Sequence, residues 1–173
     1  EELATSAEEF ASQAEQLKDA IGFFKTTDSH RGRASKGSGG LVGWNDSYKI
    51  GIKSIDDQHK VLFELINKLY TTYGKSKSKT QLKQVLVDLL DYTRYHFGNE
   101  EEIFRKIRYA GTDKHLVQHK KFIDKINAYQ KEFNAGDVSV ALDVVHFLQD
   151  WLVTHIQRTD RAYVQEFKAN GIV

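Results

Sequence analysis

The sequence of 173 residues contains no cysteine, no proline and no methionine. Without cysteine the chain forms no disulfide, offers no thiolate nucleophile and builds no cysteine-based zinc or iron–sulfur site, so any metal must be held by histidine and carboxylate groups. Without proline the strongest helix breaker is missing from every position, which favours long helices. The missing methionine predicts that the sequence is a fragment of a longer chain.

A strong net charge is also missing, since 25 basic and 24 acidic residues nearly cancel. This balance gives no reason to expect nucleic acid or an anionic membrane as a partner. The sequence also lacks a run of about 18 apolar residues, the length that spans a bilayer. We therefore expect the fragment to contact neither nucleic acid nor membrane, and its lack of cysteine fits a cytoplasmic location.

Three segments of the chain differ in composition. Residues 1–27 carry apolar side chains in alternating steps of four and three, the pattern of a coiled-coil seam, which predicts self-association through residues 1–25. The seam consists of Leu3, Ala7, Phe10, Ala14, Leu17, Ile21 and Phe24. Residues 28–40 are rich in glycine, serine and basic side chains, which predicts a flexible linker. Residues 41–173 are expected to form one domain.

Residues 41–173 contain four helical stretches separated by short polar or glycine-containing breaks. The stretches run from about 55 to 73, from Ser78 to 107, from an N-cap at Thr112 to 133, and from Asp137 to 156. Because each apolar stripe can be buried only against the others, the sequence predicts an all-α fold, an antiparallel up-down four-helix bundle. Residues 40–54, with Trp44, are expected to form an irregular arm packed on the bundle.

Polar residues interrupt the stripes that should form the core, and each of the four helices contributes at least one. They are His59, His96, Glu100, His115, His119 and His155. Burying an unpaired polar or charged group costs several kcal/mol, so these groups need a common partner, which a metal centre supplies. His96 with Glu100 and His115 with His119 are spaced i, i+4, which places each pair on one helix face.

Asp160 follows His155 by five residues, and an ideal helix would place the two about 140° apart. Either Asp160 is a surface residue, or the fourth helix carries a π-bulge or a comparable irregularity that turns Asp160 inward. We predict the irregularity, which would add Asp160 to the buried polar set.

Imidazole and carboxylate ligands together suit iron, zinc or copper. Seven ligands are too many for one tetrahedral zinc ion, but they suit two octahedral ions that share carboxylates and leave one position open. The sequence lacks the Glu-x-x-His motif of ferritin-type di-iron proteins and the His-Glu-x-x-His motif of zinc proteases.

Four motifs in order resemble the signature of the hemerythrin family, in its bacterial branch. They are Gln58-His59, His96-Phe97-x-x-Glu100-Glu101, His115-x-x-x-His119 and His155-Ile156-x-x-x-Asp160-x-x-Tyr163. The resemblance covers residues 41–173 and implies a hemerythrin-like bundle that holds two iron ions with a bridging oxo or hydroxo group. It implies that His115, His119 and His155 hold one ion, that His59 and His96 hold the other, and that Glu100 and Asp160 bridge them.

The same resemblance implies reversible dioxygen binding at the open position, and binding of azide or chloride-type anions in the ferric form. Apolar residues should wall that position and exclude water, namely Leu62, Phe97, Trp151, Leu152 and Ile156. Phe97 and Trp151 could equally be simple core residues. Tyr163 is expected to contact the ligands or the core, while Glu101 and Glu102 are expected to form a solvated face and His146 to lie off the site.

Residues 1–27 resemble the last coiled-coil stretch of methyl-accepting chemotaxis receptors in their Ala, Ser, Gln and Glu content and their Phe-Phe-Lys end. This resemblance implies an oxygen sensor domain in the cytoplasmic C-terminal part of a membrane-anchored receptor. The alternative is an amphipathic helix that merely packs on the bundle.

Three functions remain open for the predicted centre. The resemblance implies a binding protein and not an enzyme. A di-iron enzyme, such as a peroxidase, oxidase or nitric oxide reductase, would need a proton donor or a substrate channel near the open ion. An iron-storage protein would not need to respond to dioxygen or to any other gas.

Overall fold

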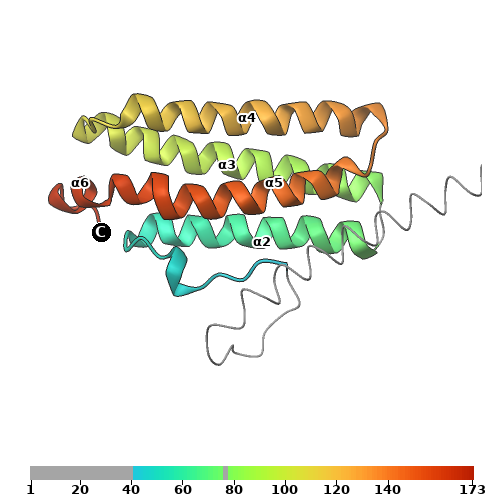
Figure 1. Cartoon of the computed structure of the whole chain (residues 1–173), viewed down its shortest axis with the longest axis horizontal. Coiled ribbons are helices and arrows are strands. Elements are labelled where there is room, and N and C mark those ends of the chain that lie inside the picture. Colours follow the sequence, from blue (N-terminus) through green and yellow to red (C-terminus); the bar gives the residue numbers. More distant parts are fainter. Residues whose placement is uncertain (1–40, 76–77) are drawn as a thin grey trace, which may run out of the picture. The chain divides into compact units, whose positions relative to one another are not determined.

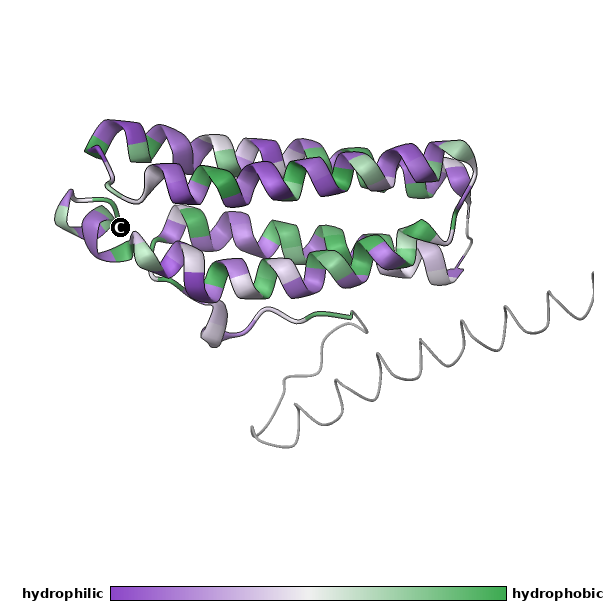
Figure 2. Ribbon diagram, turned by 45° about the horizontal axis from the view of Figure 1, so that its top comes forward, coloured by the Kyte–Doolittle hydropathy of each residue, from purple (hydrophilic) through white to green (hydrophobic). Residues whose placement is uncertain are grey.

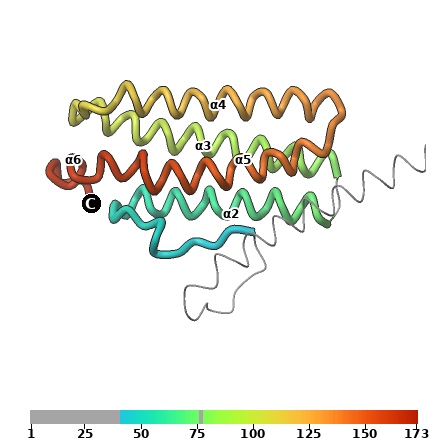
Figure 3. The backbone as a smooth tube through the Cα atoms, in the orientation of Figure 1, coloured from blue at the N-terminus to red at the C-terminus, as the bar shows by residue number. Residues whose placement is uncertain are grey.

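The computed structural model describes residues 41–75 and 78–173, and within them the chain forms four long helices. These are α2 (Lys53–Lys75), α3 (Lys79–Ile107), α4 (Thr112–Ala135) and α5 (Val140–Thr154). Figure 3 follows the chain out along α2, back along α3, out along α4 and back through α5. The prediction of an antiparallel up-down bundle is confirmed. The expected coiled-coil helix at 1–27 and linker at 28–40 lie outside the described residues.

The helices pack around a common core, with α2 and α4 each lying against α3 and α5 (Figure 1). Hydrophilic and hydrophobic segments alternate along each long helix, as Figure 2 shows. This amphipathic pattern buries one stripe of every helix and leaves the opposite face in water. None of the helices in the described ranges is apolar over a length that would cross a bilayer.

Local signals set the helix ends. The Ser78 side chain caps α3 by accepting a hydrogen bond from the Gln81 amide. Gly136, with a φ of 121°, ends α4 in a conformation that side chains disfavour. The predicted N-cap at Thr112 is wrong: Gly111 occupies the cap position, and Thr112 is the first helical residue, with its hydroxyl donating to the Tyr109 carbonyl.

The arm before α2 packs on the bundle as predicted. Val42, Ile50 and Ile52 are buried, and the Trp44 ring meets the Phe63 ring edge-on. The buried carboxylate of Asp56 accepts hydrogen bonds from the backbone amides of Ile50 and Gly51, at 2.8 and 3.0 Å. This double hydrogen bond holds the arm against the first turn of α2.

Candidate metal centre

The fourth helix is irregular where the sequence predicted it. After α5 the chain forms a π-helical turn, His155–Thr159, in which the Asp160 amide donates to the His155 carbonyl. The wider turn brings residues five apart onto one face, so Asp160 is fully buried and its carboxylate lies 3.0 Å from His155 Nε2. A short 3₁₀ turn and helix α6 (Val164–Ala169) follow.

All seven predicted ligands lie together at one end of the bundle, and none is more than 3% exposed. They are His59 from α2, His96 and Glu100 from α3, His115 and His119 from α4, and His155 and Asp160 from the π-helical turn and its end. Their ligand atoms form two groups, one of three histidines with Glu100 and one of His59 and His96 with Glu100.

The two carboxylates lie between these groups. Asp160 directs Oδ1 to within 3.4 Å of His115 Nε2, and Oδ2 to within 3.2 Å of His59 Nε2. Glu100 Oε2 lies 3.2 Å from His119 Nε2 and 3.8 Å from His96 Nε2. Each carboxylate therefore reaches both groups, as a bridging ligand between two metal ions must.

These buried polar atoms lack hydrogen-bond partners, although several approach one another at 3.0–3.8 Å. The set consists of both ring nitrogens of His59, the Nε2 atoms of His96, His115, His119 and His155, Glu100 Oε2 and both Asp160 oxygens. Within the described residues no other buried side chain leaves a polar atom unpaired in this way. Each such atom costs about 1 to 3 kcal/mol, so the set fits a pair of cations that would bind all of these atoms except His59 Nδ1, which lies on the other side of its ring from Nε2.

Hydrogen bonds on the outer side of two histidines fix which nitrogen faces the cluster. His96 Nδ1 donates to Gln58 Oε1 at 2.9 Å, and His119 Nδ1 donates to Glu101 Oε1 at 3.0 Å. Because an ionised carboxylate can only accept, the proton of His119 must sit on Nδ1, and the Nε2 lone pair is free for a metal.

Glu101 corrects the expectation of a solvated face, since its side chain is 31% exposed and contacts a proposed ligand. Glu102 meets that expectation, being exposed and paired with Lys106 at 2.7 Å. Sequence spacing gave no signal for the roles of Glu101 and Gln58, because each contacts a histidine on a different helix.

Electrostatics favour the metal-binding forms of His96 and Glu100. Burial lowers the pKa of His96 to about 4, so its imidazole stays neutral. Burial raises the pKa of Glu100, but the imidazoles of His96, His115 and His119 outweigh it and hold the pKa well below its usual value. His119 differs, because burial lowers its pKa but the carboxylates of Glu100 and Glu101 outweigh burial and raise the pKa above its usual value. Burial raises the pKa of Tyr163 well above its usual value, so its hydroxyl stays protonated and donates to Glu100 Oε1 at 2.6 Å.

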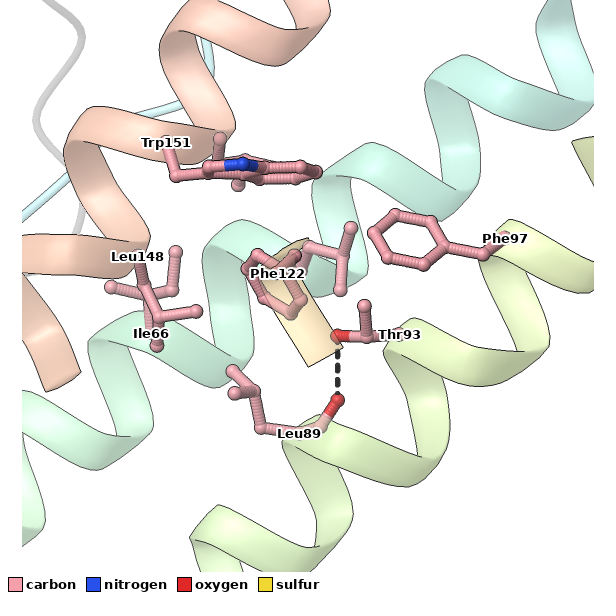
Figure 4. A pocket seen from close by; sticks show the side chains of 9 residues that line it. Ile66, Leu89, Thr93, Phe97, Phe122, Leu148 and Trp151 are labelled. Carbon is pink, nitrogen blue, oxygen red and sulfur yellow. Dashed lines mark hydrogen bonds between the residues drawn. The ribbon is translucent and has the colours of Figure 1, made fainter. Parts of the chain in front are cut away.

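A small apolar cavity, shown in Figure 4, is bordered by Phe97 and Trp151, whose rings stack on two of the proposed ligands. Its volume is about 10 Å³, which is the lower limit for holding a single water molecule. It is lined by Leu62, Ile66, Leu89, Thr93, Phe97, Phe122, Leu148, Trp151 and Leu152. The Thr93 hydroxyl, the lining's one side-chain hydroxyl, donates to the Leu89 carbonyl, as the dashed line shows, and the surface that faces the cavity is apolar.

Four of the five predicted wall residues line this cavity, while Ile156 is fully buried elsewhere in the core. Two of the four also pack against proposed ligands. The Phe97 ring stacks on His119 with centroids 3.7 Å apart, and Trp151 stacks on His155 at 4.0 Å. Phe97 and Trp151 are thus core residues and cavity walls at the same time.

A buried cluster of five imidazoles and two carboxylates in a four-helix bundle defines a class of helical metal-binding proteins. Residues 50–167 match the family described as the hemerythrin HHE cation binding domain. The chain therefore belongs to the hemerythrin family, whose domain binds a di-iron centre and whose members bind oxygen and are not typically enzymes.

Individual relatives agree with this assignment. The chain is 37% identical to a bacteriohemerythrin of Methylococcus capsulatus over 62% of this chain and 82% of the relative. It is 32% identical to a bacteriohemerythrin of Stenotrophomonas maltophilia over 75% and 84% of the two chains. A crystal structure of wild-type hemerythrin superposes with a TM-score of 0.68 at 33% identity, covering 72% of this chain and 96% of that chain.

Proposed function

We propose that this chain binds dioxygen reversibly at a di-iron centre held by the seven buried residues. The observation that carries the proposal is the position of two ligand groups, joined by Glu100 and Asp160, beside a cavity with an apolar surface. An iron pair there would supply two electrons to dioxygen and take them back on release.

The residues around the proposed centre would have three different roles: holding the ions, excluding water and positioning a ligand. His115, His119 and His155 would hold one ion, and His59 and His96 the other, which is then one imidazole short and keeps a position for the gas. Leu62, Phe97, Trp151 and Leu152 would keep water and anions from that position, which favours release of dioxygen over irreversible oxidation. Tyr163 would hold the Glu100 carboxylate in place.

Metal analysis and optical spectra test this proposal. We expect two iron ions per chain and an aerobic charge-transfer band that disappears on deoxygenation and returns with oxygen. The variant His155→Leu should lose iron and the band, while Glu102→Gln, altered one position beyond Glu101, should keep both. Irreversible bleaching, or an iron-free protein, would overturn the proposal, and steady turnover of peroxide or nitric oxide would indicate a di-iron enzyme instead.

We further propose that the domain senses oxygen at the cytoplasmic C-terminal end of a membrane-anchored chemotaxis receptor, with residues 1–27 as the end of its coiled coil. The arm that joins this segment to the bundle touches the site. The Trp44 ring lies 6.5 Å from the His59 ring, and Arg161, next to Asp160, donates to the Ser47 carbonyl at 2.8 Å. A shift at the ligands can therefore reach the arm through packed contacts.

Hydrogen exchange tests the sensor proposal in the full chain. Amide exchange in residues 1–27 and 41–52 should differ between the oxygen-free and oxygen-bound forms, and equal exchange would contradict it. Sedimentation should show dimers through residues 1–25, and removal of these residues should leave monomers that still bind azide in the ferric form.

A further inference from the structure

The two histidines whose outer nitrogens are hydrogen-bonded have unequal partners. His119, in the three-histidine group, donates to the carboxylate of Glu101, whereas His96, in the two-histidine group, donates to the neutral amide oxygen of Gln58. The two bonds have nearly the same length, 3.0 and 2.9 Å, so charge is the main difference between them.

The charge of Glu101 is directed at His119 alone. Arg94 and Lys120 line the same surface groove, but they form ion pairs with Asp91 and Asp124 at 3.5 and 2.6 Å. Within the described residues, the one basic side chain that approaches Glu101 to ion-pair distance is His119. The carboxylate is therefore not neutralised by a neighbouring cation.

A carboxylate that accepts the outer N–H of an imidazole increases the electron density on the inner nitrogen and strengthens it as a ligand. Stronger donation stabilises a more highly charged metal ion. A neutral amide accepts the same proton with a weaker effect, since charged hydrogen bonds are roughly twice as strong as neutral ones.

We propose that Glu101 and Gln58 are positioning residues that make the two iron sites electronically unequal, with Glu101 favouring the ferric state at the three-histidine ion. Gln58 leaves the two-histidine ion, with its open position, more easily kept ferrous. The reduction potential of the centre is therefore set in part by two residues that are not themselves iron ligands. This inference rests on the proposed di-iron function.

Exchange of the two partners tests the inference. In Glu101→Gln the reduction potential of the iron centre should rise by roughly 59 mV for a one-electron step. At a fixed solution potential this rise lowers the ferric-to-ferrous ratio about tenfold. Gln58→Glu should lower the potential. Iron affinity, measured by chelator competition, should fall about 10-fold or more in Glu101→Gln.

One control variant and the iron content of the parent protein separate the outcomes. Glu102→Gln removes an equal charge from the adjacent position and should leave the potential and the iron affinity unchanged. If Glu101→Gln has the potential and the iron affinity of the parent protein, or if Gln58→Glu raises the potential, the inference is overturned while the di-iron function stands. If the parent protein itself binds no iron, the function fails first.

Discussion

The two ends of the bundle differ in what their cores contain. At the site end, where α2 begins, α3 ends and α4 begins, imidazoles and carboxylates with unpaired atoms lie among apolar side chains such as Phe104. At the distal end, where α2 ends and α3 begins, it consists of apolar side chains such as Leu69, Leu82, Leu86 and Phe133. Both ends share one set of helices, so the distal end can stabilise a fold whose site end is destabilised until metal binds.

Removal of iron should give the largest difference between the ends. Relative to protein with free iron at a thousand times the dissociation constant, the metal-free form should lose about 4 kcal/mol of unfolding free energy. Amide exchange should increase around Glu100 and His119 while Leu69 and Leu86 stay protected. A uniform loss of protection along all four helices would contradict the division into two ends.

Truncation of a distal side chain should affect stability without affecting the site. Leu69 is fully buried, and Leu69→Ala should lower the unfolding free energy by about 3 kcal/mol in denaturant titrations. Iron stoichiometry in the folded fraction should remain that of the parent protein. Loss of iron at full folding would show that the two ends are more tightly coupled than the structure indicates.

At the site end, loss of one hydrogen bond should lower the unfolding free energy more than loss of a small buried surface area does. Tyr163→Phe removes the hydroxyl that donates to Glu100 at 2.6 Å and should cost about 2 kcal/mol, because a buried carboxylate oxygen loses its partner. Calorimetry of the metal-free protein measures this cost. Tyr95→Phe is the matched control, since Tyr95 is 57% exposed, and should change stability by less than about 0.5 kcal/mol.

The smallest predicted effect has the opposite sign. His59 is fully buried with both ring nitrogens unpaired, so His59→Leu should raise the unfolding free energy of the metal-free protein by about 1 kcal/mol. In the presence of iron the same variant should be less stable than the parent, because it loses a proposed ligand. A variant that is destabilised in both forms would show that His59 is needed for packing.

Most of the fold was predictable because helical periodicity is a local property. The apolar periodicity of the four predicted stretches placed the four long helices correctly, with ends within two or three residues. The error at Thr112 arose because a threonine before a helix and a threonine that begins one look alike in sequence. The π-helical turn was predictable because a buried role for Asp160 cannot be reconciled with a regular helix.

The site was predicted in part. The order of the histidines and acids identified the proposed ligands, and the resemblance included Leu62, one turn after His59, among the wall residues. The far wall of the cavity, formed by Ile66, Leu89, Phe122 and Leu148, was not singled out, although these residues lie within the predicted helical stretches. Which of many apolar stripe residues border a cavity depends on how four helices pack.

The number of helices, their buried faces, the chemistry of the proposed metal ligands and the irregularity before Asp160 could all be predicted from the sequence, because residue type and spacing along one helix decide these features. Tertiary structure alone decided that Glu101 and Gln58 would each meet a histidine of another helix, and that the arm would touch His59 and Arg161. Such contacts depend on the axial position and rotation of one helix against another, which side-chain packing sets only when all the helices come together.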